Sequence, residues 1–149
     1  MQFAALAIFA ALALAGAWID IARRTIPNLL SLTLIVIGLT WAAIAGDLAG
    51  FLDQGGHFLA ALAIGMAMFA IRAWGGGDAK FYPAIAAWIP LDHAIMLAVA
   101  IALAGGILVG IYALLRRFSQ TRAEGTLMLP YGVAIAAGGL VIQGKMLLF

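Results

Sequence analysis

The sequence predicts an all-α membrane protein with six transmembrane helices, and three observations support this fold class. The first is composition: of 149 residues, 66% are hydrophobic and only 9% are charged, and the mean hydropathy is +1.16. A soluble domain of this size carries about a quarter charged residues, so this chain lacks the polar side chains to cover a soluble globule. The second observation is a series of apolar segments, and the third is the charge of the connections between them. We expect a single domain, residues 1–149.

Six apolar segments are long enough, or nearly so, for helices that cross a bilayer, which needs about 20 residues. They are residues 3–20, 28–46, 57–74, 79–90, 93–115 and 128–148. The first has no basic n-region before it, and we interpret it as a retained helix rather than a cleaved leader. The fourth is short and follows the stretch Gly-Gly-Gly-Asp-Ala-Lys, residues 75–80. We therefore expect it to begin inside the protein rather than at the lipid surface.

The connections between these segments alternate in charge. Seven of the eight Lys and Arg residues fall on connections one, three and five, and Lys145 is the exception. The seven are Arg23, Arg24, Arg72, Lys80, Arg116, Arg117 and Arg122. The second and fourth connections carry Asp47, Asp53, Asp92 and His93 instead. The positive-inside rule therefore places the odd connections in the cytoplasm and both termini on the opposite side. A net charge of +2 is too small to indicate nucleic-acid binding.

Two aspartates share one membrane depth in this topology. Asp20 ends the first helix and Asp78 begins the fourth, both at the cytoplasmic boundary. Taken alone, Asp78 also fits a helix N-cap, and Asp20 fits an interfacial anion paired with the arginines that follow it. Two carboxylates close together in a partly desolvated site hold a shared proton. One then activates water while the other polarises a carbonyl, so the pair predicts an aspartic protease that needs no metal or cofactor.

Other mechanisms fit the sequence less well. The absence of cysteine excludes disulfides, thiol nucleophiles and cysteine-bound zinc. There is no His-Glu-x-x-His sequence, and His57 and His93 are both predicted on the outer side, away from a cytoplasmic serine such as Ser31. The sequence also allows a second interpretation, a small transporter or assembly scaffold that binds ions through the same aspartates, although the chain has no inverted repeat.

The chain resembles the type IV prepilin peptidases, which are GxGD-type aspartic proteases of the bacterial inner membrane. Residues 20–28, Asp-Ile-Ala-Arg-Arg-Thr-Ile-Pro-Asn, are similar to the first motif of that family, and residues 75–80 to the second. Residues 129–132, Leu-Pro-Tyr-Gly, are similar to its Pro-[Phe/Tyr]-Gly segment. The resemblance implies a GxGD-protease-like bundle in which Asp20 and Asp78 are the catalytic pair. The supporting motif residues are Pro27, Asn28, Gly75, Gly77, Lys80, Pro130, Tyr131 and Gly132.

The resemblance also implies the substrate: a prepilin or pseudopilin whose basic leader is cut on the cytoplasmic side, just before a hydrophobic helix. The chain begins at its first helix and lacks the cysteines of longer members. It therefore resembles the short, peptidase-only branch of Flp/Tad-type pilus systems, and methyltransferase activity is not expected. A GxGD intramembrane protease with other clients remains an alternative.

The sequence allows two interpretations for several of the supporting residues. Lys80 either acts on the aspartates or a substrate carbonyl, or anchors the topology. Asn28 either bonds the loop backbone or positions water, and we favour the structural role. Pro27 is expected in the first turn of the second helix. The glycines of residues 75–77 either give clearance to an extended substrate or only break the helix. The GxxxG sequence from Gly106 to Gly110 serves either homo-oligomerisation or packing within the bundle.

Overall fold

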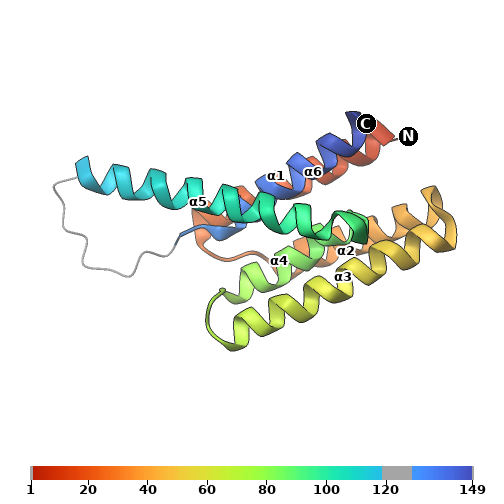
Figure 1. The fold of residues 1–149 in the computed structure, drawn as a ribbon, viewed down its shortest axis with the longest axis horizontal. Helices are drawn as coiled ribbons and strands as arrows, with labels where there is room; N and C mark the ends of the chain where they lie inside the picture. The colour runs from red at the N-terminus through yellow and green to blue at the C-terminus, as the bar shows by residue number, and fades with distance from the viewer. Residues whose placement is uncertain (1, 119–128, 149) are drawn as a thin grey trace.

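The computed structural model describes residues 2–118 and 129–148, which form six α-helices and one short 3₁₀ turn. The elements are α1 (Gln2–Arg23), α2 (Asn28–Ala45), α3 (Asp47–Ala70), α4 (Gly76–Ala86), η1 (Leu91–His93), α5 (Ala94–Phe118) and α6 (Tyr131–Leu148). No strand occurs in these two ranges. Helices α1 and α6 pack together, and the start of α1 and the end of α6 lie at the same end of the molecule (Figure 1). The predicted all-helical fold is confirmed.

Four segments are long and apolar enough to cross a membrane: α1, α2, residues 91–117 and α6. Helix α3 is also long, but its first half contains aspartate, glutamine and histidine. Helix α4 has only 11 residues, a length of about 16 Å against a hydrocarbon core of about 30 Å. The chain is therefore a membrane protein, while the count of six spans and the side of the termini stay predictions.

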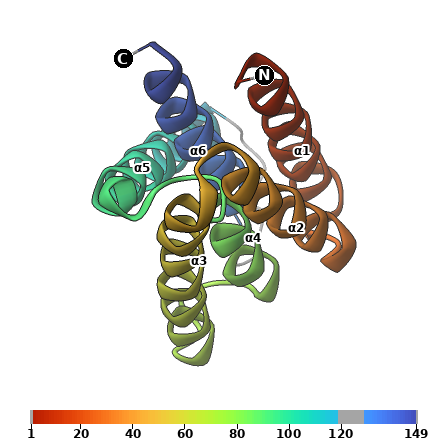
Figure 2. The same cartoon turned by 90° about the vertical axis from the view of Figure 1, so that its right-hand side faces the viewer.

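Helix α4 lies at the centre of the bundle, in contact with α2, α3 and α6 (Figure 2). Every residue from Phe81 to Ile89 is buried. Pro83 stands inside this helix and lacks the N–H that would bond the carbonyl of Ala79. Helix α3 passes close to this carbonyl at Gly65, where an added Cβ would lie 2.5 Å from the Ala79 oxygen. The short helix therefore runs inside protein from Phe81 onward, whereas its first turn is half-buried and Lys80 is exposed.

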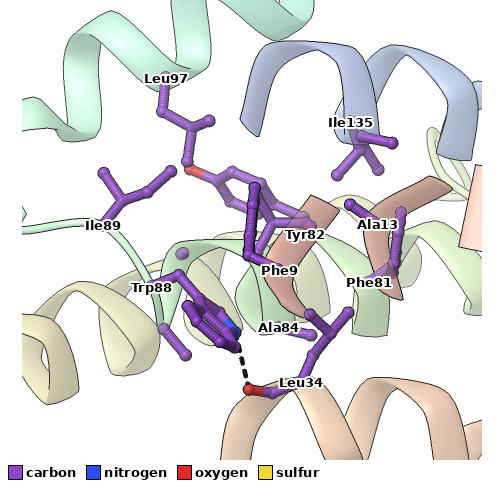
Figure 3. Packing of buried hydrophobic residues seen from close by; sticks show 14 of the residues in the cluster. Phe9, Ala13, Leu34, Phe81, Tyr82, Ala84, Trp88, Ile89, Leu97 and Ile135 are labelled. Atoms are coloured by element: carbon purple, nitrogen blue, oxygen red, sulfur yellow. Dashed lines mark hydrogen bonds between the residues drawn. The ribbon is translucent and has the colours of Figure 1, made fainter. Parts of the chain in front are cut away.

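The turn that follows α4 is held by polar contacts with three other helices. The Trp88 indole N–H donates to the carbonyl of Leu34 in α2 at 2.8 Å (Figure 3). The Gln143 side chain in α6 donates to the Trp88 carbonyl at 2.6 Å. His57 Nδ1 in α3 lies 2.7 Å from the carbonyl oxygen of Ile89. Irregular backbone is tolerated at membrane depth only where protein satisfies its polar groups, and these contacts meet that condition.

The core around α4 is mostly aliphatic and aromatic. The rings of Phe9 and Trp88 lie 5.3 Å apart between centroids. Phe81 and Leu34 are fully buried beside them (Figure 3). Gly16 of α1 allows the close approach of Phe81, because an added Cβ would lie 2.5 Å from its ring. This packing fixes α4 against α1 and α2 and so sets the position of its first turn.

The predicted start of the third helix was wrong. Helix α3 begins at Asp47, so Asp47 and Asp53 lie within a helix and not in a connection, and Gly46 alone joins α2 to α3. The Asp47 side chain accepts the backbone N–H of Ala49 at 2.8 Å, which satisfies one of the free donors of a helix start. The polar composition of this segment had suggested a loop, but its polar groups fit the helix.

Other boundaries differ by a few residues. Helix α4 runs from Gly76 to Ala86 instead of 79–90, which puts Gly76, Gly77 and Asp78 inside it. Helix α5 extends to Phe118, so Arg116 and Arg117 lie in its last turn. Helix α6 begins at Tyr131 rather than at 128. Arg122 lies outside the described residues.

Candidate active site

Asp20 lies near the end of α1 and is 6% exposed. Its backbone carbonyl accepts the N–H of Arg24 at 2.9 Å, and Arg24 ends the helix with a left-handed φ of 55°. Its carboxylate accepts the backbone N–H of Gly132 at 2.9 Å. Gly132 belongs to the first turn of α6, where backbone N–H groups are free and the helix dipole is positive. The start of α6 therefore binds the Asp20 carboxylate.

Asp78 lies in the first turn of α4, after the N-cap residue Gly75. The backbone N–H of Gly75 favours the ionised form of its carboxylate, and a Cβ added to Gly75 would lie 3.3 Å from Asp78 Oδ2. The N-cap of α4 is Gly75, so the interpretation of Asp78 as the N-cap is wrong. Asp78 lies outside the four membrane-spanning segments. Burial, and then the neighbouring charge of Asp20, raise the pKa of the Asp78 carboxyl from 3.8 to about 6.

The two predicted aspartates occupy one site. Their carboxylates interact electrostatically although they come from the end of α1 and the start of α4. Both are at least partly buried, and a backbone N–H favours the ionised form of each carboxylate. The charge of Asp20 opposes the ionisation of Asp78, so the two carboxyl groups do not both ionise readily.

Ile26 is the residue that joins the three motif segments. It is 5% exposed and lies between Gly77 of α4 and Gly132 of α6. A Cβ on Gly77 would lie 3.3 Å from the Ile26 nitrogen, and one on Gly132 would lie 2.9 Å from Ile26 Cδ1. No described glycine has a positive φ, so these glycines act through close approach. At Gly77 and Gly132 the space beside the glycine is occupied by Ile26 of the chain itself, so clearance for a substrate at residues 75–77 stays a prediction.

Lys80 pairs with Asn28 instead of the aspartates. Its Nζ donates a hydrogen bond to Asn28 Oδ1, and both residues are exposed. The contact ties the start of α4 to the start of α2 and supports the structural role expected for Asn28. Pro27 is the N-cap of α2 and not a residue of its first turn, and its carbonyl accepts the N–H of Leu30 at 3.2 Å.

Trp74 is a site residue that sequence reasoning missed. Its ring lies 5.5 Å from that of Tyr82 and 5.8 Å from that of Tyr131, measured between centroids. Tyr131 in turn interacts electrostatically with Asp78. Trp74 thus packs the segment before the glycines against the start of α6, next to buried Pro130. Its place directly before the glycine run was the available signal.

The helical bundle and this site together define a membrane protein with paired carboxylates, the arrangement that aspartic peptidases use. Within residues 2–118 and 129–148, no cluster of three or more His, Cys, Asp or Glu side chains is positioned for a metal ion.

The family can be stated from a comparison of the sequence with known families. The model of the type IV leader peptidase family matches residues 7–114. The match covers most of the chain and includes Asp20 and Asp78, and it ends before Pro130, Tyr131 and Gly132. The chain belongs to this family, and the predicted resemblance is confirmed. No curated protein and no solved structure matched the chain.

Proposed function

We propose that the chain is a membrane aspartic endopeptidase that removes the basic leader from type IV prepilins or pseudopilins at the cytoplasmic face. One observation carries the proposal: Asp20 and Asp78 share a single partly buried site inside the segment that matches a leader peptidase family. Family membership supports peptidase activity, and the paired carboxylates supply its aspartic mechanism.

The surroundings of the two carboxylates assign their roles. The Asp20 carboxylate accepts the Gly132 N–H at the start of α6, and a hydrogen bond to the charged form favours it, so we assign Asp20 as the ionised member. Asp78, whose pKa is raised to about 6, holds the proton. Asp20 takes a proton from water as the water oxygen attacks the scissile carbonyl carbon. Asp78 donates its proton to the carbonyl oxygen. As the C–N bond breaks, Asp20 passes the proton that it took from water to the leaving amine, and a hydroxyl of the tetrahedral intermediate returns a proton to Asp78.

The orientation follows from charge. Arg23 and Arg24 follow Asp20 in the sequence, and Arg72 and Lys80 lie on either side of Asp78. The positive-inside rule assigns the boundary with these residues to the cytoplasm of a bacterial inner membrane. A prepilin presents its leader there while its apolar helix lies in the bilayer. The peptidase therefore meets its substrate from the lipid side and requires no cofactor or nucleic acid.

Two alternatives are tested with the proposal. A GxGD protease with other clients has the same dyad but no need for a prepilin leader. An ion-binding transporter or pilus-assembly scaffold uses the aspartates without cleavage, and membership of a peptidase family argues against it.

Co-expression with a tagged prepilin tests these assignments. The wild-type chain is expected to shorten the prepilin, with a new N-terminus directly after the leader by N-terminal sequencing. A prepilin whose last leader Gly is replaced should stay uncut, because only a protease of broad specificity ignores that change. The Asp20→Asn, Asp78→Asn double variant should be inactive, whereas Asp92→Asn, a change of the same kind on an exposed residue of η1, should be active. No cleavage of any prepilin by the wild type would overturn the proposal in favour of a scaffold.

A further inference from the structure

Trp74 ties the connection between α3 and α4 to two helices. Residues 71–75 form this connection, and Trp74 is the only one of them that is not exposed. Its ring lies 5.5 Å from the Tyr82 ring of α4, edge to face, and 5.8 Å from the Tyr131 ring of α6. Tyr82 belongs to the buried core around α4 (Figure 3). Ring pairs at such distances add stability beyond the apolar area that they bury, so the ring of Trp74 anchors the connection.

Each of the two tyrosines stands next to one aspartate of the dyad. Tyr82 follows Asp78 by four residues, so the two side chains lie on the same side of α4. Tyr131 directly precedes Gly132, whose backbone N–H binds the Asp20 carboxylate at 2.9 Å. Tyr131 also interacts electrostatically with Asp78. The aromatic contact thus joins the face of α4 that carries one carboxylate to the turn of α6 that binds the other.

Asp78 lies between this aromatic contact and the contact that Ile26 makes. Successive residues are about 100° apart around a helix, so Gly77 and Tyr82 lie on either side of Asp78 on the surface of α4. Ile26 occupies the space between Gly77 and Gly132 of α6. Two contacts therefore connect α4 with α6 beside the carboxylate, one through an aliphatic side chain and one through aromatic rings.

Trp74 differs from a tryptophan that only marks a membrane boundary, where such residues face the headgroups. Trp18 is of that kind, because it is 71% exposed although it precedes Asp20 by only two residues. Trp74 precedes Asp78 by four residues, but it is half-buried and its ring packs on two tyrosines. Trp18 is therefore a matched control for Trp74.

We propose that Trp74 is a positioning residue that sets the separation of the Asp20 and Asp78 carboxylates by holding the first turn of α4 against the first turn of α6. It acts through the rings of the two tyrosines. Residues 76–78 are only half-buried, so this turn moves relative to α6 when the ring is lost. The inference rests on the proposed function, because it takes the two carboxylates as the groups that act on water and on the substrate.

Leader cleavage by purified Trp74→Leu tests the proposal, with each rate expressed per folded molecule. We expect kcat to fall by about 30-fold while KM for prepilin stays within about twofold, because a displacement of about 1 Å can cost about 100-fold in rate. Trp74→Phe keeps a ring for the two tyrosines, so its kcat should stay within about threefold of the wild type. Trp18→Leu should cleave at the wild-type rate.

The pH dependence of kcat/KM distinguishes positioning from a merely structural role. Asp20 of α1 and Tyr131 of α6 are the titratable groups that act on Asp78 among the described residues, and the Arg24 charge acts on Asp20. Burial and the charge of Asp20 raise the pKa of Asp78 to about 6, so its proton is lost as pH rises through 6. A wider separation hydrates Asp78 and weakens the effect of the charge. The loss of activity in Trp74→Leu should therefore move to lower pH by about one unit.

The outcomes separate this inference from the proposed function. The wild type is first shown to cleave prepilin and Asp78→Asn to be inactive, and a wild type that cleaves nothing would overturn both proposals. If Trp74→Leu keeps kcat within about threefold, the positioning role is wrong and the peptidase stands. A lower kcat with an unchanged pH midpoint, or a loss that Trp74→Phe shares, would also overturn the positioning role.

Tyr131→Leu tests the same contact from the other side, and it replaces Trp74→Leu if that variant does not fold. It should show the same fall in kcat and the same shift of the pH midpoint. If both residues act through one ring contact, the double variant should lose no more than about threefold beyond the more severe single variant. Losses that multiply in the double variant would show that Trp74 does not act through Tyr131.

Discussion

The two ends of α4 are both packed inside the bundle, yet their polar groups are bonded in different ways. At the carboxyl end, the carbonyls of Trp88 and Ile89 face the Gln143 side chain and the His57 ring, and the Trp88 indole bonds Leu34. At the amino end, one backbone N–H is described for each of the two carboxylates. At the carboxyl end, these polar groups have partners in other helices. At the amino end, two carboxylates of like charge share one site.

This difference separates a structural end from a reactive one. A carboxylate offers about four acceptor sites, so a single N–H leaves room for water and a substrate. Two neighbouring carboxylates also lower the stability of the fold, and such strain persists where function requires it. Changes at the carboxyl end should therefore affect folding, and changes at the amino end should affect catalysis.

Among changes that keep both carboxylates, the largest effect is expected for Gly132→Ala. The added Cβ would lie 2.8 Å from Asp20 Oδ2 and 2.9 Å from Ile26 Cδ1, which displaces the carboxylate. We expect kcat/KM for leader cleavage to fall by about 100-fold, or about 2.7 kcal/mol. Gly144→Ala in the same helix is the control, since nothing lies within 4 Å of its Cβ position. If the activity of Gly132→Ala stays within threefold of the wild type, the start of α6 does not position the Asp20 carboxylate for catalysis.

Trp88→Phe, at the carboxyl end of α4, should lower stability and leave the cleavage rate almost unchanged. It leaves the buried Leu34 carbonyl without its donor, at a cost of about 1–3 kcal/mol in the free energy of unfolding. Denaturation of the purified protein measures this loss. The cleavage rate per folded molecule should stay within about twofold of the wild type. A large fall in that rate at unchanged stability would show that the two ends are not separate in function.

Asp78→Asn should raise stability while it removes activity. Because the pKa of Asp78 is raised to about 6 in the folded chain, the stability that this group contributes is present below its unfolded pKa and is lost as pH rises through 6. At pH 7.5 the variant should be more stable by about 1–2 kcal/mol, after allowance for partial exposure, and the gain should shrink near pH 4. Thermal unfolding at the two pH values measures it, and a variant less stable at pH 7.5 would contradict this account.

Lys80 and Asn28 should give the smallest effect. Lys80→Met and Asn28→Ala each remove the same exposed hydrogen bond, so each should lower kcat/KM by about threefold, and the double variant should be no worse than either. If Lys80 acted directly on the dyad, only Lys80→Met would shift the pH dependence of cleavage.

Much of the site was predictable because its chemistry is local in the sequence. Each aspartate stands at a helix end beside glycine or arginine, and loop charges alone placed both at one membrane boundary. The contacts of Ile26, Trp74 and Lys80 were not predictable, because they join segments whose separation only packing determines. The start of α3 was missed because polar residues at a helix terminus resemble a loop in composition.

The most direct test of the account is the rate of leader cleavage by purified Asp20→Asn and Asp78→Asn variants, each confirmed as folded by thermal unfolding. If both carboxylates act on one water and one carbonyl, each single change should lower kcat by at least about 1,000-fold. A folded variant of either kind that cleaves prepilin at a rate near that of the wild type would show that Asp20 and Asp78 are not the catalytic pair.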